Sequence, residues 1–380
     1  LVERSPGGIV RDWTHEGFSV RSRVHEYGGG EYWLSTGTNG ATVAWFVDFG
    51  TQRVFRQDGP DLTPVPVTPE LGPSHRYADG LVVGGSEWIV AVRERHEGRE
   101  ATEVFNELVV FPTDGSKDPR VIAGGDGQVV PADFVASPTV SPDGKSIAWV
   151  SWDHPNMPWD STTLWVAPFN AMAATITGEP KAISDRVHAD GSRASLVHPS
   201  WGPDGSLHVL TDASGWWNLA RIDSSGSVVP LISVEADLCG PFWGFTPAPY
   251  AFLPDGSVLI APRHGGNARL ATFKLHAGGT LDYLGDGWVG GSPCLSGTRV
   301  LALMGRTTHA PRVVTIELQE KEPKFEVLRE ADASIPDEDI SIGEAVTFST
   351  ASGAPAHATY YAPRNASYEA PAGELPPVLV

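Results

Sequence analysis

Aromatic rings, carboxylates and histidines gather in a few short segments of this sequence, and these residue types suit the binding of a small charged or aromatic molecule. The segments read VHEYGGG (24–30), RERH (93–96), WDHPNMPWD (152–160), SGWWN (214–218) and EADLCGPFW (235–243). A carboxylate can bind an ammonium group through a charge-assisted hydrogen bond, and an aromatic ring supplies apolar area. Together they suit recognition of a peptide, of its amino terminus or of another domain.

The candidate residues for contact with a substrate or with a neighbouring domain come from all five segments: His25, Glu26, Tyr27, Arg95, His96, Asp153, His154, Trp159, Trp216, Trp217, Glu235, Phe242 and Trp243. Glu26 and Glu235 are the carboxylates expected to contact a charged or polar ligand. Taken singly, each residue also fits a structural role, because tryptophans pack loops and carboxylates cap turns. The run Gly28–Gly30 predicts close backbone approach or positive φ rather than a phosphate site, since no helix follows it.

No catalytic motif can be assembled from the chain. The sequence lacks the G-x-S-x-G nucleophile turn, and the His264-Gly265-Gly266 run, although similar to an oxyanion motif, lies between two predicted strands and reads as a hairpin loop. The histidines are scattered, and the two cysteines are too few for a zinc site or a disulfide framework. We therefore predict no catalytic residue in this chain, no metal and no cofactor.

A repeated pattern of short strands and turns, called the repeated phrase below, must position these segments. Pro-Asp-Gly turns at 141–144, 202–205 and 253–256 each precede a short apolar strand, which a loop and another strand follow. Asp-Gly suits tight hairpins because glycine accepts a positive φ and aspartate caps the turn. The same phrase without Pro-Asp-Gly occurs at 41–56, 87–110 and 297–318. Six second strands are predicted to begin near residues 42, 88, 146, 206, 257 and 299.

A repeat of roughly 40 to 60 residues with several short strands predicts an all-β fold of the β-propeller type. Six blades are counted, and strands at 1–3 and 8–13 are expected to be the outer strands of a seventh, truncated blade. A β-sandwich is the alternative, although sandwiches do not usually repeat one phrase six times. The Pro-Asp-Gly turns are expected on one face of the propeller and the candidate residues on the other, with Arg95 and His96 in a loop between strands.

The composition agrees with a turn-rich β protein. The 380 residues include 42 glycines, 32 prolines and 13 tryptophans, which argues against long helices and against low complexity. The formal net charge of −19 argues against nucleic acid as a partner, because phosphate binding needs a clustered basic surface. No apolar stretch is long enough to cross a bilayer, so no membrane partner is expected. Low cysteine use and acidity fit a bacterial cytoplasm, and any targeting signal would precede Leu1.

The repeat ends near Ser334. The segments 344–350 and 357–362 predict one further hairpin, and 375–380 predicts an apolar strand at the end of the chain. We expect a β-propeller domain over 1–333, and over 334–380 a linker with the first strands of a domain that continues beyond Val380.

Several phrases resemble serine peptidases of the prolyl oligopeptidase family, and most closely its dipeptidyl aminopeptidase and acylaminoacyl-peptidase-like branch, which includes the bacterial puromycin hydrolases. The phrases are VHEYGGGEYW, SPDGKSIAWVSWDHPNMPWDSTTLWVA, PSWGPDGSLHVLTDASGWWNLARID and EAVTFSTASGAPAHATYYAPRN. The resemblance covers essentially the whole chain, and WDHPNMPWD is highly specific. Arg95 departs from the family pattern, which more often has an aspartate before the histidine at position 96.

The resemblance implies a seven-bladed propeller that caps an α/β-hydrolase domain with a Ser-Asp-His triad, and cleavage of short peptides or aminoacyl amides between the two. It also implies that 334–380 holds the opening strands of that hydrolase domain and that the whole triad lies beyond Val380. This chain would then gate and select substrates. Its partners would be the C-terminal hydrolase domain of the same protein and a short peptide or aminoacyl amide.

Two other functions stay open from the residues alone. A stand-alone propeller would bind a protein or peptide without catalysis. A propeller enzyme with its own site, such as a lactonase or a glycosidase, would need converging carboxylates or metal ligands that the sequence does not specify.

Overall fold

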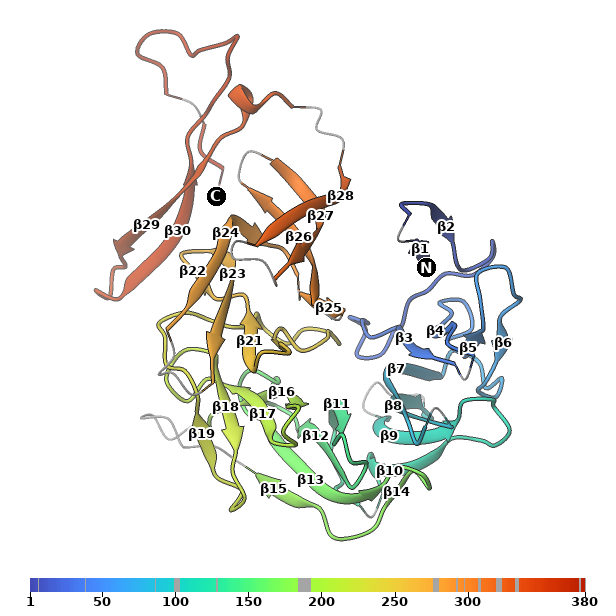
Figure 1. The fold of residues 1–380 in the computed structure, drawn as a ribbon. Helices are drawn as coiled ribbons and strands as arrows, with labels where there is room; N and C mark the ends of the chain where they lie inside the picture. Colours follow the sequence, from blue (N-terminus) through green and yellow to red (C-terminus); the bar gives the residue numbers. More distant parts are fainter. Residues whose placement is uncertain are drawn as a thin grey trace. The chain divides into compact units, whose positions relative to one another are not determined.

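The computed structural model describes residues 1–380 except 6, 38, 86, 99–102, 128, 184–192, 276–279, 292, 297, 307–308, 319–322, 332–334, 376 and 380. Nearly all regular structure in the described residues is β-strand, and the helix found there is the short 3-10 helix η1 (Asp337–Asp339) (Figure 1). The chain divides into two compact units, Leu1–Val234 with Cys239–Ala248, and Glu235–Leu238 with Pro249–Val380. The all-β fold class predicted from the sequence is confirmed.

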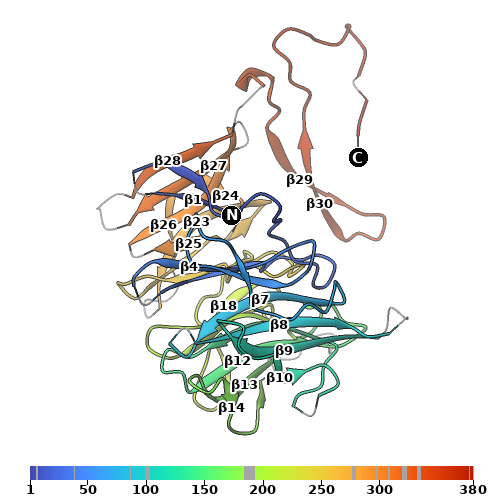
Figure 2. The ribbon, with the colours of Figure 1, turned by 90° about the vertical axis from the view of Figure 1, so that its right-hand side faces the viewer.

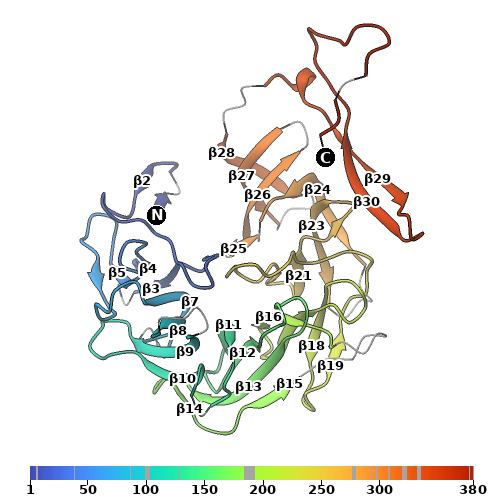
Figure 3. The ribbon, with the colours of Figure 1, turned by 180° about the vertical axis from the view of Figure 1, so that it is seen from behind.

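Four antiparallel meanders with their strands in sequence order build the first unit (Figures 2 and 3). The first comprises β3 (Tyr32–Thr36), β4 (Thr42–Val47), β5 (Val54–Gln57) and β6 (Val65–Pro66), and the second comprises β7 (His75–Val83), β8 (Trp88–His96), β9 (Val104–Pro112) and β10 (Arg120–Gly124). The third comprises β11 (Phe134–Val140), β12 (Ser146–Trp152) and β13 (Thr163–Asn170), and both β14 (Thr175–Ile176) and β15 (Lys181–Ile183) pair with β13. The fourth comprises β16 (Leu196–Trp201), β17 (Leu207–Thr211), β18 (Asn218–Ile222) and β19 (Val228–Pro230). Each meander is one blade. A separate hairpin, β1 (Val2–Arg4) with β2 (Val10–Asp12), confirms the two strands predicted near the first residue.

The second unit carries two more blades joined in one nine-stranded sheet. The first of them comprises β20 (Ala251–Phe252), β21 (Ser257–Ile260), β22 (Arg263–His264), β23 (Asn267–Lys274) and β24 (Asp282–Val289), and the second comprises β25 (Cys294–Ser296), β26 (Arg299–Arg306), β27 (His309–Glu317) and β28 (Lys324–Glu330). The two are joined because the end of β24 also pairs with β26. A hairpin of β29 (Gly343–Ser349) and β30 (Pro355–Tyr361) follows, as the sequence predicted.

Six blades therefore match the six repeats of the sequence. The second strands of the repeat are β4, β8, β12, β17, β21 and β26, and each begins within one residue of its predicted position. The three Pro-Asp-Gly turns join the first and second strands of their blades. In each turn the aspartate side chain accepts a backbone N–H two residues later, at 3.1 Å for Asp143, 3.0 Å for Asp204 and 3.0 Å for Asp255. Local turn chemistry thus fixes the register of these strands.

The core lies between blades rather than within one of them. Strand β12 is buried at every position from Ile147 to Trp152, because neighbouring blades cover both of its faces. One buried cluster surrounds Trp149, and a second includes Trp45, Tyr77 and Phe111 from the first two blades. Consecutive apolar residues in the middle strands are what such double-sided burial requires.

The first strands of three successive blades carry the same β-bulge. The register with the next strand shifts at Ala78/Leu81 in β7, at Ala136/Thr139 in β11 and at Val197/Ser200 in β16. The residues inside these shifts, Asp79, Ser137 and His198, have φ of 54°, 55° and 53°. The N–H of Asp79 donates to the Gly30 carbonyl (2.8 Å), and the N–H of Ser137 donates to the Asp79 carboxylate (2.6 Å). These bonds link consecutive blades directly.

The last predicted strand is not formed. Leu375 and Pro377–Leu379 lie outside any strand, whereas positions 376 and 380 are outside the described residues. A single strand without a partner leaves its backbone groups to water, so pairing and not apolar character decides whether it forms. In the part of the chain that the structure describes, no helix is long and apolar enough to cross a membrane.

Candidate functional site

The segment 24–30, which precedes the first strand of the first blade, forms a loop in which five of seven residues have left-handed backbone. The φ angles are 56° at His25, 62° at Glu26, and 72°, 90° and 54° at Gly28, Gly29 and Gly30. A positive φ costs a residue other than glycine about 1–3 kcal/mol, so His25 and Glu26 keep it only because surrounding groups hold them there.

The glycines of this loop allow a second loop to approach its backbone. Phe245 donates its N–H to the Gly28 carbonyl at 3.1 Å and forms a parallel bridge with Gly29. A Cβ on Gly29 would lie 2.2 Å from the Phe245 carbonyl oxygen, so no side chain fits there. The prediction of close backbone approach and positive φ at Gly28–Gly30 is confirmed.

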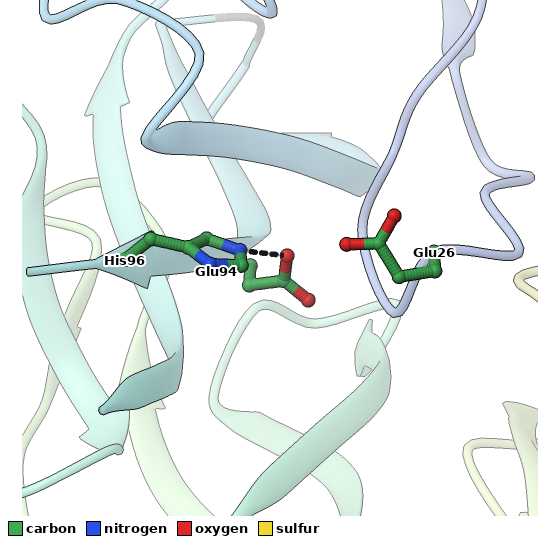
Figure 4. A group of neighbouring side chains, drawn as sticks. All are labelled: Glu26, Glu94 and His96. Atoms are coloured by element: carbon green, nitrogen blue, oxygen red, sulfur yellow. Dashed lines mark hydrogen bonds and ion pairs between the residues drawn. The ribbon is translucent and has the colours of Figure 1, made fainter. Parts of the chain in front are cut away.

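A charged cluster, defined here as Arg76, Glu94, His96 and Glu26, includes one residue of this loop, Glu26. Figure 4 shows Glu26 together with Glu94 and His96. The Glu94 carboxylate is 4% exposed, and its Oε1 accepts hydrogen bonds from Arg76 (2.9 Å) and His96 (2.6 Å). Its Oε2 accepts the backbone N–H of His25 at 2.7 Å. Arg76 also binds Oε1 of Glu26 at 2.6 Å, although the Glu26 side chain is 72% exposed. A buried carboxylate thus connects to an exposed one through a single guanidinium.

The same cluster bears on metal binding. Glu26, Glu94 and His96 each place one possible ligand atom within 4.8 Å of the others. The Arg76 guanidinium already bonds to both carboxylates, so a positive charge is held where a metal ion would be needed. An ion-pair network accounts for this geometry, and we assign no metal to it.

A second carboxylate, Glu107, is buried in the same sheet. Arg93 binds one of its oxygens through two nitrogens at 2.9 and 2.6 Å, and Arg95 binds the other oxygen at 3.0 Å. The Arg95 guanidinium also lies 4.7 Å from the centre of the Phe105 ring. The loop predicted for Arg95 and His96 is wrong, because β8 continues through position 96 with Arg95 paired to Phe105. Long blade strands carry both residues.

The His25 ring is enclosed by aromatic side chains. Its centroid lies 5.2 Å from that of Phe134, 5.7 Å from that of Trp152 and 4.9 Å from that of Phe245. Burial lowers the pKa of His25 to about 4, against smaller opposing effects of Glu94 and of the hydrogen bond to Asn106. His25 is therefore a neutral ring at pH 7 and anchors the loop instead of providing a charge.

Three rings form an aromatic platform, defined as Tyr27, Trp159 and Trp243. The Trp243 centroid lies 5.4 Å from that of Tyr27 and 4.4 Å from that of Trp159. Tyr27 is 59% exposed and Trp243 51%, so much of the platform faces solvent. The pairing of loops 24–30 and 240–245 brings Tyr27 and Trp243 together. Large exposed rings of this kind commonly mark binding surfaces.

Two candidates from the WDHPNMPWD phrase have local structural roles. Asp153 accepts the N–H of Asp133 at 2.8 Å, and Asp133 in turn accepts the N–H of His154 at 2.9 Å. The His154 ring lies 4.9 Å from that of Phe134. The Asp153 carboxylate thus ties two loops together, which is a structural role but not the turn capping that the sequence suggested.

Phe242 is a core residue. It is 8% exposed and packs against Trp152 (6.3 Å between centroids) and His198 (4.9 Å). Burial lowers the pKa of His198 to about 4, so this histidine too is neutral at pH 7. Phe242 precedes Trp243 of the platform in the sequence, but its own ring is buried among Trp152, His198 and Phe245.

The remaining candidates lie elsewhere. Trp216 and Trp217 are half-buried in the turn between β17 and β18. The Trp216 carbonyl accepts hydrogen bonds from the Ser214 hydroxyl and from the side-chain amide of Asn218 in β18, both at 3.1 Å. Glu235 is an exposed residue of the second unit, and its carbonyl bonds to Nδ1 of His264 at 2.9 Å. The structure thus brings His25, Glu26, Tyr27, His96, Trp159 and Trp243 into one region of the first unit. Phe242 and His154 adjoin this region, because they pack against Phe245 and Phe134, two of the rings that surround His25. Trp216 and Trp217 lie in the turn between β17 and β18, and Glu235 belongs to the second unit.

Sequence reasoning missed Arg76, Glu94 and Asn106. Arg76 and Glu94 face each other across β7 and β8, and opposite charges at directly paired positions are a known stabilising pattern in sheets. The alternation RERH carried the signal, because Glu94 points to the opposite face from Arg93 and Arg95. Asn106 bonds to the His25 ring at 3.0 Å and had no such pattern to reveal it.

Comparisons with known proteins bear on the fold of the chain. No family model matches the chain, and no curated protein matches it. Among solved structures, the fold is that of peptidases of the prolyl oligopeptidase family, so the resemblance indicated by the sequence phrases is confirmed for a propeller portion. Prolyl oligopeptidase B from Galerina marginata shares the fold at 10% identity, with a TM-score of 0.56 over 86% of this chain and 55% of its own.

Among solved structures the chain is also similar to puromycin-hydrolysing enzymes. It matches a puromycin hydrolase at 27% identity and a TM-score of 0.87, over 99% of this chain and 57% of the other. It matches a puromycin-hydrolysing peptidase of Mycobacterium tuberculosis at 29% identity and a TM-score of 0.85, over 98% and 56%. The chain thus spans little more than half the length of these structures.

Proposed function

We propose that this chain is the propeller portion of a serine peptidase that cleaves short peptides or aminoacyl amides, and that it gates and selects substrates. The observation that carries the proposal is the match to two puromycin-hydrolysing enzymes over 98–99% of this chain. Their sequence identity of 27–29% goes beyond a likeness of fold alone. On this proposal the protein acts in the bacterial cytoplasm.

In this proposal the Ser-Asp-His triad belongs to a C-terminal α/β-hydrolase domain of the same protein, and no residue of this chain is catalytic. Residues 1–333 form the propeller domain, in which β1 and β2 are outer strands of a seventh blade. Residues 334–380 form the linker and the first strands of the hydrolase. The hairpin β29–β30 supports this, since Val346, Phe348 and Tyr360 are 37%, 55% and 52% exposed, as expected of a sheet that another domain covers.

The part of the first unit best suited to contact substrate is the loop 24–30 with its aromatic platform. Glu26 projects a largely exposed carboxylate whose backbone is fixed, which suits the ammonium group of a short peptide or an aminoacyl amide. Tyr27 and Trp243 supply apolar area beside it. Of the two carboxylates favoured by the sequence, Glu26 has this setting, and Glu235 remains a proposed contact from the second unit.

The experiment that tests the proposal is fluorophosphonate labelling of the protein expressed from its complete reading frame, followed by intact mass of each labelled species. We expect one label on a polypeptide that contains residues 1–380 and extends beyond them, because an activated serine reacts with this probe. Loss of the label after mutation of the labelled serine is the control. An unlabelled protein that still binds peptides would overturn the peptidase and favour a propeller that only binds.

A further inference from the structure

Substrate gating alone does not explain the hydrogen bonds of the Glu94 carboxylate. Its carboxylate is almost fully buried and accepts three hydrogen bonds, from the Arg76 guanidinium, the His96 ring and the backbone N–H of His25. Two of these donors are side chains of the same sheet, but the third belongs to the loop that carries Glu26. The Glu94 carboxylate is therefore one of the groups through which the sheet holds the loop.

The loop needs such support because of its backbone. His25 and Glu26 are consecutive left-handed residues, and neither is a glycine. The bond from the His25 N–H to Glu94, at 2.7 Å, acts at the first of them. Arg76 acts on the second from another side, because it binds the Glu26 carboxylate at 2.6 Å and the Arg23 carbonyl at 3.0 Å. Backbone and side chain of Glu26 are thus both restrained through Glu94 and its arginine.

The charges of this group indicate which ligand it would accept. Glu26 and Glu94 share the guanidinium of Arg76, and the His96 ring also donates a hydrogen bond to Glu94, so the arginine is the one permanent positive charge in this cluster of two carboxylates. The described contacts of the Glu26 carboxylate use Oε1, and its side chain is largely exposed. A cationic ligand would offset the negative charge of the Glu26 carboxylate, so a cation is the ligand that this cluster favours.

We propose that Glu94 is a positioning residue, which acts through the His25 N–H and through Arg76 to hold the Glu26 carboxylate ready for a protonated amine. This inference rests on the proposed function for the identity of the ligand, a short peptide or an aminoacyl amide with a free amino group. The positioning itself is a property of this chain and can be measured without catalysis.

The matched control is Glu107. It is a buried carboxylate of the neighbouring strand, paired with Arg93 and Arg95, and its described contacts do not involve the 24–30 loop. Glu94→Gln and Glu107→Gln each remove one buried negative charge from the same blade, but only Glu94→Gln weakens the hold on His25 and Arg76. Effects common to both variants report stability of the blade, and effects limited to Glu94→Gln report positioning.

Two measurements on the 380-residue chain test the inference. The first is hydrogen exchange of the backbone amides in 24–30, where we expect about tenfold faster exchange in Glu94→Gln and little change in Glu107→Gln, since a hydrogen bond to a charged group is being weakened. The second is calorimetric binding of L-phenylalaninamide, with N-acetyl-L-phenylalaninamide as the uncharged match. We expect Glu94→Gln and Glu26→Gln each to weaken binding of the free amine about tenfold.

The outcomes separate the inference from the proposed function. If the wild-type chain binds both amides equally, it does not recognise the amine, and that part of the proposed function is wrong. The exchange data would still decide whether Glu94 holds the loop. If Glu94→Gln exchanges like wild type at 24–30, the positioning role is wrong. Should Glu94→Gln not fold, Arg76→Lys serves in its place, because a lysine keeps the charge but not the fork that reaches Glu26, Glu94 and Arg23.

Discussion

Two carboxylates of the first unit, the buried Glu94 and the half-buried Asp79, differ in how far their surroundings compensate the negative charge. Glu94 has a guanidinium at 2.9 Å and two further donors. Asp79, at the bulge of β7, has the N–H of Ser137 at 2.6 Å as the described partner of its carboxylate. Burial raises the pKa of Asp79 to about 6, and the hydrogen bond from Ser137 opposes this only in part. An ionised Asp79 is therefore a cost to the folded state at pH 7.

Asp79→Asn is expected to stabilise the protein at neutral pH. Above pH 6 the carboxylate is ionised in the folded and unfolded states, and only the folded state bears the desolvation cost. As pH falls through 6 the folded state binds a proton that the unfolded state, with a pKa of 3.8, does not yet bind, so the wild type recovers. We expect the variant to gain about 1–2 kcal/mol at pH 7 and to lose that advantage near pH 4.

Urea denaturation of both proteins between pH 4 and pH 8 measures this difference. Asparagine can still accept the Ser137 N–H through its carbonyl oxygen, so the link between blades is kept. A variant less stable than the wild type at pH 7 would mean that the charged hydrogen bond outweighs burial.

At the scale of elements, the candidate site depends on two loops that meet backbone to backbone. Loop 24–30 and loop 240–245 join at Gly29 and Phe245, and this contact places Tyr27 beside Trp243. Loop 24–30 is further anchored on the second blade through Glu94 and Arg76. The platform is thus assembled by segments from opposite ends of the first unit's chain. Its geometry depends on the contact between Gly29 and Phe245.

Gly29→Ala is expected to break the junction. A methyl group at this position would meet the Phe245 carbonyl at 2.2 Å in addition to requiring a φ of 90°. The matched control is Gly215→Ala, since Gly215 has a φ of 86° and open space around its Cβ position. We expect a loss of unfolding free energy of about 3 kcal/mol for Gly29→Ala and about 1 kcal/mol for Gly215→Ala, by chemical denaturation. Equal losses would show that backbone strain and not the close approach sets the cost.

The sequence predicted most elements because their signals are local. Pro-Asp-Gly turns and runs such as SIAWVS located the second strands within one residue. It failed where the deciding partner is remote: the end of β8 through His96 depends on its pairing with Val104, and no strand forms at Pro377–Leu379 despite its apolar residues. For the site, exposed residues such as Glu26 and Trp243 could be named from the sequence. The RERH alternation sets Glu94 apart from its neighbours, but its partner Arg76 is known only from the pairing of β7 with β8.

At the scale of the whole molecule, charge is the dominant feature. The formal net charge is −19 on 380 residues, and several ion pairs of the described residues are exposed, such as Arg56–Asp58 and Arg299–Glu317. Exposed pairs contribute little to stability, so repulsion among the excess carboxylates is the larger electrostatic effect. An acidic surface also favours approach of a cationic ligand from a distance.

Salt is therefore expected to stabilise the chain. Raising NaCl from about 20 mM to about 300 mM shortens the screening length and reduces the self-repulsion, and we expect Tm to rise by a few degrees. Differential scanning calorimetry at pH 7 measures this, with sucrose at equal osmolality as the control for a general solute effect. A Tm that falls with NaCl would show that the ion pairs, buried Glu94 and Glu107 included, outweigh the repulsion.

The bridge between Gly29 and Phe245 also has a consequence for biosynthesis. Roughly 200 residues separate the two, so closing this contact is a late event for a chain made from its N-terminus. The four blades of the first unit can pair their strands locally as they emerge, but the loop that bears Glu26 and Tyr27 has to wait for residue 245. On the ribosome the first unit would thus possess folded blades before the 24–30 loop and the aromatic platform are assembled.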